Sequence, residues 1–103
     1  MSQIPLDALS AEQFKEQLHQ PFRIRADEET IEVRLVEVRD LESHSRREDK
    51  SPFSILFAGP SERPLPQRIY RLENDGMGEL ELFLVNLGPD ADGDGMIYEA
   101  VFT

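Results

Sequence analysis

The stretch FRIRADEETIEVRLVEV, residues 22–38, decides the fold class of this chain. Apolar and charged residues alternate over residues 22–26 and again over residues 31–35. Successive side chains of a β-strand point to opposite faces, so this period of two predicts two strands, each with one buried face. The acidic residues 27–29 between them predict a turn, and the two strands are therefore expected to form an antiparallel hairpin.

The second of these strands has an irregularity at Leu35 and Val36, where two apolar residues are adjacent. Val36 and Val38 continue the alternation in the opposite phase. A β-bulge, which inserts one extra residue into a strand, would restore a single buried face, and we expect one here.

The rest of the chain contains four more strand-like segments, separated by turn and loop signals. The strands are expected at residues 52–59, 67–72, 79–87 and 96–102, and the connections at 41–51, 59–66, 74–76 and 89–95. Asn74-Asp75-Gly76 is a strong turn signal because these residues tolerate positive φ. Short connections favour antiparallel neighbours. The predicted core residues are Phe53, Ile55, Phe57, Leu82, Leu84 and Val101, and the aromatic side chains of Phe83, Tyr98 and Phe102 are also expected inside.

A helix is predicted over residues 6–19, ahead of antiparallel β-structure over about 22–103. Ser10 followed by Gln13 matches a capping box, and Pro21 is expected to end the helix. Ala11, Phe14 and Leu18 can share one apolar face. The predicted fold class is therefore α+β, mainly β: a single domain over residues 1–103, in which one N-terminal helix caps a six-stranded antiparallel sheet or small barrel.

The charge of the chain argues against several classes of partner. Its 103 residues include 21 acidic and 11 basic ones, for a net charge of −10. Such a field repels nucleic-acid phosphates and anionic membrane surfaces, so we expect no nucleic acid and no membrane as partner. There is no cysteine, which excludes disulfides and thiolate chemistry. Residues 1–5 show no signal-peptide pattern and no apolar run is long enough to span a bilayer, so a cytoplasmic location is expected.

Three acidic residues, Asp90, Asp92 and Asp94, form the sharpest metal candidate, in the sequence DADGDG at residues 90–95. Alternate carboxylates followed by glycine are typical of a calcium loop. A calcium loop of the EF-hand type also needs a glutamate at position 12, and that position is Val101. We therefore expect an acidic turn between strands, with no metal and no cofactor.

The catalytic candidates are equally incomplete. Ser43-His44-Ser45, near Asp40, contains the residue types of a hydrolase triad, but triad geometry comes from a fold rather than from adjacency in one polar loop. The other histidine, His19, falls at the predicted helix end. No catalytic residue is predicted, and the protein is expected not to be an enzyme.

Several segments together resemble a bacterial family of small single-domain proteins of unknown function. They are LDALSAEQF at 6–14, PFSILFAGP at 52–60, LPQRIY at 65–70, GELELF at 78–83, and GPD at 88–90 with MIYEAVF at 96–102. The resemblance covers nearly the whole chain and brings no catalytic residues. It implies that members are encoded near phage-tail-collar-like proteins. The chain departs from the family pattern at residues 92–95, where the family has a shorter turn, which indicates tolerance to length rather than a metal site.

These observations predict a non-enzymatic protein-binding or assembly module, accessory to a phage-tail-like structure. Open strand edges or the helix face are expected to carry the contact, and the partner is expected to be basic or to present a complementary strand. Self-association is left open. The alternatives are a small-ligand-binding β-barrel and a hydrolase that uses scattered carboxylates. A closed interior cavity would favour the ligand, and a filled core with an exposed apolar patch would favour assembly.

Overall fold

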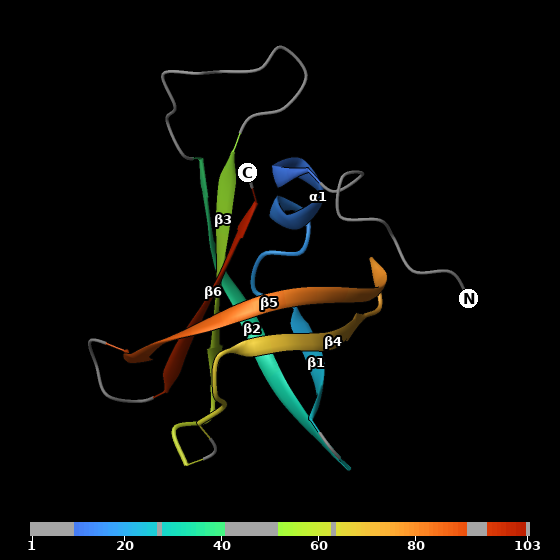
Figure 1. Cartoon of the computed structure of the whole chain (residues 1–103). Helices are drawn as coiled ribbons and strands as arrows, with labels where there is room; N and C mark the ends of the chain where they lie inside the picture. Colours follow the sequence, from blue (N-terminus) through green and yellow to red (C-terminus); the bar gives the residue numbers. More distant parts are fainter. Residues whose placement is uncertain (1–9, 27, 41–51, 63, 91–94, 103) are drawn as a thin grey trace.

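The computed structural model describes residues 10–26, 28–40, 52–62, 64–90 and 95–102. Within these ranges, one short helix precedes six strands (Figure 1). The elements are α1 (Ala11–Lys15), β1 (Pro21–Ala26), β2 (Glu29–Asp40), β3 (Phe53–Gly59), β4 (Arg68–Asn74), β5 (Gly78–Pro89) and β6 (Met96–Phe102). The predicted strands are therefore all present, and the first hairpin, β1–β2, has its turn where the sequence places it.

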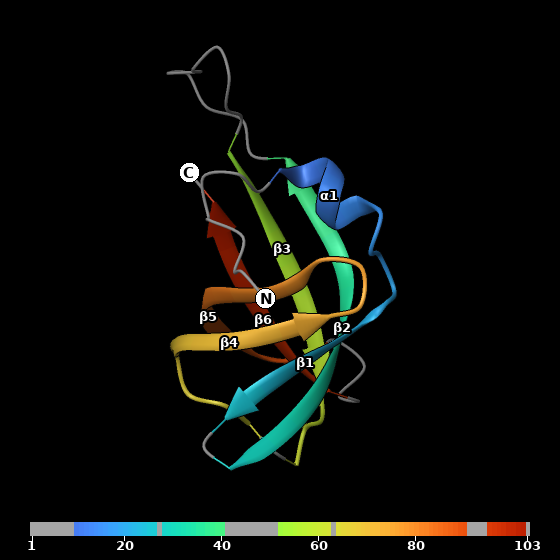
Figure 2. The same ribbon diagram turned by 90° about the vertical axis from the view of Figure 1, so that its right-hand side faces the viewer.

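The six strands close into an antiparallel barrel in the order β1-β2-β3-β6-β5-β4. The chain forms two meanders, β1–β2–β3 and β4–β5–β6, which join through the pairs β1–β4 and β3–β6. Each meander has a central strand of 12 residues, β2 or β5, flanked by shorter ones. Both long strands cross the molecule obliquely (Figures 1 and 2). The predicted mainly β class is confirmed, and of its two variants the barrel is the one observed.

The bulge predicted in β2 is confirmed. The register between β2 and β3 shifts at Val36, so that Leu35 lies opposite Phe57 and Val38 lies opposite Ile55. The extra residue brings Leu35 and Val38, three positions apart, to the same side of the strand. Leu35 is fully buried and Val38 packs against the core. β5 has a similar irregularity near its C-terminal end, which the sequence analysis does not predict.

Inward-facing side chains from all six strands fill the barrel. The Phe22 and Phe57 rings meet edge to face with centroids 5.0 Å apart. The hydroxyl of Tyr98 accepts a hydrogen bond of 2.9 Å from the backbone N–H of Leu65, which anchors the connection between β3 and β4. The fully buried side chains include Phe14, Phe22, Ile24, Leu35, Ile55, Phe57, Leu72, Leu80, Leu84 and Tyr98.

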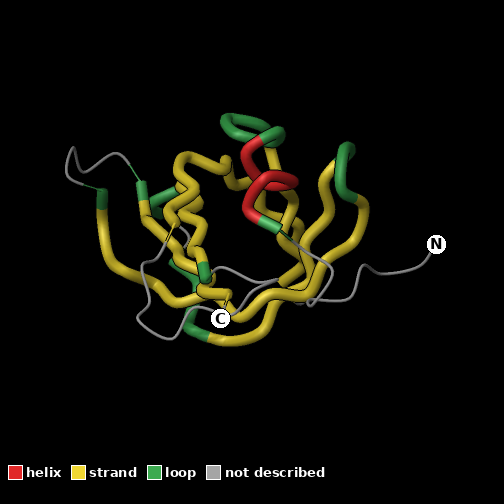
Figure 3. The backbone as a smooth tube through the Cα atoms, turned by 90° about the horizontal axis from the view of Figure 1, so that it is seen from above, coloured by secondary structure: helices red, strands yellow, loops and turns green. Residues whose placement is uncertain are grey.

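The helix α1 lies over one mouth of this barrel (Figure 3). Ser10 and Gln13 form the predicted capping box, with Ser10 N–H donating to Gln13 Oε1 at 2.8 Å. Phe14 is fully buried, and its ring lies 5.9 Å from the Phe53 ring and 5.4 Å from the Phe102 ring between centroids. No helix among the described residues has the length and apolar character needed to cross a membrane.

The predicted helix end at His19 is wrong. Residues 6–9 lie outside the described part of the chain, and the helix from Ala11 stops at Lys15. Gln17 and Leu18 donate their backbone N–H groups to carbonyls three residues earlier, which tightens the chain into turns. His19 then adopts φ 69°, in the left-handed region, and its N–H bonds the Leu35 carbonyl at 2.7 Å. Pro21 therefore begins β1 instead of ending the helix.

The β4–β5 turn forms where it is predicted, but by a different mechanism. Asn74, which is buried, accepts hydrogen bonds of 2.8 Å at Oδ1 from the N–H groups of Gly76 and Met77. Its Nδ2 donates to the Pro21 carbonyl at 3.1 Å, which ties the turn to β1. The positive φ expected within residues 74–76 occurs instead at Gly78, with φ 80°.

Candidate functional site

The outer face of β5 changes character halfway along the strand. Its inward face is buried throughout, with Leu80, Leu82 and Leu84 at 0–2% exposure. The outward positions begin as Glu79 and Glu81 and continue as Phe83 and Val85. Leu87, beyond them, is also exposed. An outward strand face in contact with water is normally polar, so the second half of β5 departs from the pattern of its first half.

Ile69 on β4 extends this apolar surface. Ile69 and Phe83 are direct register partners, so their side chains stand next to each other on the outside of the barrel. They are 65% and 49% exposed, and Leu87 is 52% exposed. We refer to Ile69, Phe83, Val85 and Leu87 as the β5 apolar stripe. These side chains form an exposed apolar patch, a type of surface that is enriched at interaction sites in other proteins.

The barrel contains an internal comparison for this stripe. β2 occupies in the first meander the place that β5 occupies in the second, and has the same length. Apart from Thr30 near its start and the bulged residue Val36, the outward side chains of β2 are charged: Glu32, Arg34, Glu37 and Arg39. Closure of the barrel therefore does not require apolar residues on the outside of its long strands.

The predictions that Phe83 and Val101 are buried are wrong. Phe83 is in the stripe, and Val101 is 51% exposed on β6. Strand phase explains both errors, because Phe83 shares a face with Glu81 and Val101 shares a face with Glu99. The same period of two that predicts the strands would have placed both residues outside. The other predicted core residues, Phe53, Ile55, Phe57, Leu82 and Leu84, are buried.

An acidic row borders the stripe on the side of β6. Leu56 on β3 is the register partner of both Glu37 on β2 and Glu99 on β6, and Glu99 is also the partner of Val85. Register partners share a face, so these four residues cross four adjacent strands in one line on the outside of the barrel. Leu56 is nevertheless only 6% exposed, so it forms an apolar floor between two carboxylates.

One guanidinium, that of Arg39, accompanies this row. Arg39 Nε donates to Glu37 Oε2 at 2.6 Å. This hydrogen bond and the charge of Glu37, with a smaller contribution from Glu99, raise the pKa of Arg39 above its ordinary value. Among the residues that the structure describes, two carboxylates share this one cation, so this part of the surface carries an excess of negative charge.

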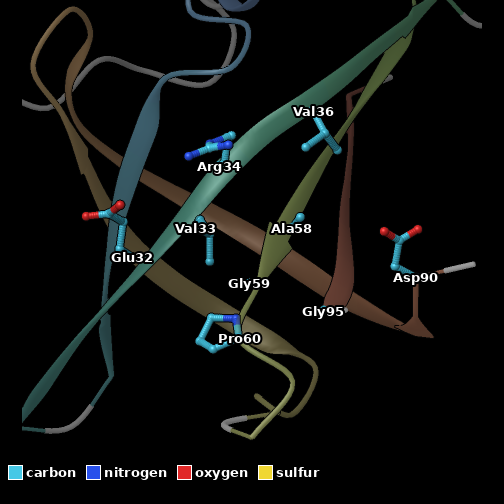
Figure 4. Close-up of a pocket in the computed structure, with 9 residues that line it drawn as sticks. All are labelled: Glu32, Val33, Arg34, Val36, Ala58, Gly59, Pro60, Asp90 and Gly95. Carbon is cyan, nitrogen blue, oxygen red and sulfur yellow. The ribbon is translucent and has the colours of Figure 1, made fainter. Parts of the chain in front are cut away.

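A groove of about 370 Å³ lies on the outside of the barrel, over β2 and β3 (Figure 4). Val36, Ala58 and Pro60 supply apolar surface, and one cationic and two anionic side chains, those of Arg34, Glu32 and Asp90, also line it. The groove is open to solvent, and its mixed charges select no single class of small molecule. The barrel interior, where a ligand-binding barrel would hold its ligand, is occupied by side chains.

The described part of the chain does not bring the predicted metal and catalytic candidates together into one site. Asp90 donates its backbone N–H to the Gly95 carbonyl at 2.7 Å, while Asp92 and Asp94 lie outside the described residues. In the described ranges no group of three or more His, Asp or Glu side chains is placed to hold a metal. His44 also lies outside them, and His19 is exposed. The expectations of no metal and no catalysis stay predictions.

The fold and its surface define a small, closed, antiparallel barrel with a helix over one mouth and an apolar stripe on its outside. The chain belongs to the family described as a domain of unknown function, DUF6916, whose model matches residues 9–102. The resemblance found in the sequence to a small family of unknown function is thereby confirmed. Neither a curated protein nor a solved structure gives a significant match to the chain.

Proposed function

We propose that this protein is a non-enzymatic protein-binding or assembly module, and that the β5 apolar stripe carries the contact. The observation that supports this is the contrast between the two long strands. β5 presents Phe83, next to Ile69, at the position in the fold where β2 presents charge. Exposed aromatic and aliphatic side chains lower solubility, and a cross-strand pair on the outside of a monomer contributes at most about 1 kcal/mol, so a partner is a physical reason to keep them.

The geometry favours this function over the alternatives. In the described part of the chain, side chains occupy the barrel interior, where a ligand-binding barrel would hold its ligand, and a filled core with an exposed apolar patch is the combination expected of an assembly component. Strand edges, the contact expected from the sequence, are a poor candidate because the strand order is closed. The outer positions of α1, such as Glu12 and Lys15, are polar and exposed, so the helix face offers no apolar contact.

The family resemblance supports a setting for this contact. The resemblance implies that family members are encoded near phage-tail-collar-like proteins. A member encoded there would act as an accessory to a phage-tail-like structure, assembled in the cytoplasm. The net charge of −10 fits a protein partner better than nucleic acid or an anionic membrane. The stripe, rather than any catalytic group, is then the functional part of the molecule.

The test compares two double variants in affinity capture from native lysate. Ile69→Ser with Phe83→Ser removes the centre of the stripe, and Glu32→Ser with Arg34→Ser changes two exposed residues on β2 without changing the net charge. We expect the first variant to lower the affinity for the captured partner at least about tenfold, as loss of an interface anchor does. The second should bind like the wild type. Circular dichroism melts of both confirm that the barrel is intact.

A panel of hydrolase substrates run on the same preparations distinguishes the enzyme alternative. Saturable turnover that is lost on mutating one carboxylate, with no protein captured by the wild type, would replace this proposal by a catalytic function. Equal capture by the wild type and the Ile69→Ser, Phe83→Ser variant would show that the contact lies elsewhere.

A further inference from the structure

The surface next to the stripe has the chemistry to select the charge of a partner. Along the line Glu37–Leu56–Glu99–Val85, a buried leucine is flanked by a carboxylate on each neighbouring strand. Adjacent strands are about 4.8 Å apart, so the two carboxylates arise from backbones roughly 10 Å apart, with Leu56 between them. An arginine or lysine stem fits such an apolar floor, and its charged head fits between acidic side chains.

Arg39 shows that the row attracts a guanidinium. Its Nε lies 2.6 Å from Glu37 Oε2, on the same face of the same strand. The side chain of Arg39 is 52% exposed, so solvent and other molecules can reach this cation. Among the described residues this is the one guanidinium at the row, and its ion pair is with Glu37, so the carboxylate of Glu99 can receive another cation.

Ser54 supplies a second, independent observation. Ser54 lies on the same outward face of β3 as Leu56, two residues before it. Its register partners are Arg39 on β2 and Val101 on β6. Ser54 is 1% exposed, and its hydroxyl has no hydrogen-bond partner among the described residues. A buried polar group without a partner lowers stability, and this one lies beside the acidic row, where a donor could satisfy it once the side chains that cover it move aside.

We propose that the acidic row of Glu37 and Glu99 over Leu56 binds an arginine or lysine side chain of a basic polypeptide segment, whose apolar side chains cover the β5 apolar stripe. This inference rests on the proposed protein-binding function and specifies the chemistry of its partner. Val85 belongs to both surfaces, so one segment crossing β5 and β6 contacts both. The net charge of −10 favours a basic occupant over a second copy of the chain, which would repel the first.

The experiment selects binders from a displayed library of random peptides on the immobilised wild-type protein, with counter-selection on the Ile69→Ser, Phe83→Ser variant. We expect the enriched peptides to combine arginine or lysine with apolar residues. Synthetic copies of an enriched peptide are then titrated at low and high salt. Affinity should fall as salt rises, because exposed charges are screened.

Two double variants, each of which removes two negative charges, test where the cationic side chain of the peptide binds. Glu37→Gln with Glu99→Gln should weaken the peptide at least about tenfold, a usual size for loss of a close charge pair at an interface. Glu12→Gln in α1 with Glu16→Gln at its C-cap, both exposed, should stay within about twofold, since surface charges away from a contact contribute little. Replacing arginine in the peptide by citrulline, which is neutral and similar in shape, should weaken binding as the first variant does.

The outcomes separate this inference from the proposed function. Enriched peptides without basic residues, or equal affinity for the wild type and the Glu37→Gln, Glu99→Gln variant, would overturn the acidic row as the cation site and leave the stripe as a contact surface. If no peptide is enriched on the wild type relative to the Ile69→Ser, Phe83→Ser variant, the proposed cation site is also overturned. The capture experiment would then decide whether the chain binds another protein. Glu99→Gln alone gives a milder variant if the double one is destabilised.

Discussion

Phe57 and Phe83 have the same side chain and opposite roles. Phe57 is fully buried on β3, against Phe22, while Phe83 is half-exposed in the β5 apolar stripe. Which role a phenylalanine takes is set by the phase of its strand. Hydrophobicity alone predicts that Phe57 and Phe83 are both buried. The predictions for Phe83 and Val101 are wrong because they rest on the hydrophobicity of each residue and not on its position in the strand.

Truncating these two phenylalanines should therefore have different effects on stability. Phe57→Ala should lower the free energy of unfolding by about 3–5 kcal/mol, because a buried ring is lost and a cavity is left. Phe83→Ala should lower it by less than about 1 kcal/mol, because about half of that side chain already contacts water and no buried cavity is left. Denaturant melts of both variants measure the difference. A loss under about 1 kcal/mol for Phe57→Ala would contradict the assigned phase of β3.

The candidate site was visible in the sequence only in part. Leu80, Leu82 and Leu84 alternate with Glu79 and Glu81, and this pattern assigns position 83 to the outside. The row of Glu37, Leu56 and Glu99 could not be read in the same way, because it depends on pairing between β2, β3 and β6. No local pattern specifies which residues of three separate segments become register partners.

For the helix and the strands, local sequence signals correctly predict the features that depend on interactions between neighbouring residues. The capping box at Ser10 and the bulge at Leu35–Val36 both follow from neighbouring residues, and both are observed. The helix end was misjudged because the backbone of His19 bonds to Leu35, a contact with β2 that no helix pattern contains. Tertiary pairing overrides helix propensity there, and the chain turns early enough to let β1 begin at Pro21.

The turn between β4 and β5 gives a test at this scale. Asn74→Ala should lower the free energy of unfolding by about 1–3 kcal/mol, because the N–H groups of Gly76 and Met77 and the carbonyl of Pro21 lose their partner. Asp75→Ala is the control in the same turn. Its side chain is 94% exposed and pairs only with Arg23 among the described contacts, so the change should stay within about 1 kcal/mol.

Thermal or denaturant unfolding compares these two turn variants. If Asp75→Ala proves as damaging as Asn74→Ala, the surface ion pair, rather than the buried amide, would be the group that holds the turn.

For the whole molecule, the number of strands could be predicted and the closure could not. Each strand has its own alternation, and the β1–β2 and β4–β5 hairpins pair neighbours in the chain. The pairs β1–β4 and β3–β6, which close the barrel, join segments far apart in the sequence. The expectation of open strand edges failed for this reason. The charged outer face of β2 can be compared with the partly apolar outer face of β5 only once the closed strand order is known, because that order shows that the two strands occupy equivalent places.

The two meanders also imply that the order of the halves along the chain is not essential to the barrel. The ring of Phe102, at the end of β6, lies 5.4 Å from that of Phe14 in α1, so the end of the second half adjoins the start of the first. Ser61 and Glu62, between the halves, are exposed. A circular permutant that opens the chain there, and joins Thr103 to Met1 by a short flexible linker, should keep a β-rich circular dichroism spectrum and one cooperative melt.

A second permutant, opened between Leu65 and Pro66, gives the contrast. Leu65 bonds Tyr98 through its N–H and the Asn86 side chain through its carbonyl, so an opening at that position cuts an anchored segment and should melt at a lower temperature. Equal melting of the two permutants would mean that this anchor contributes nothing. A folded first permutant would show that each meander is a complete half of the barrel, able to come first or second.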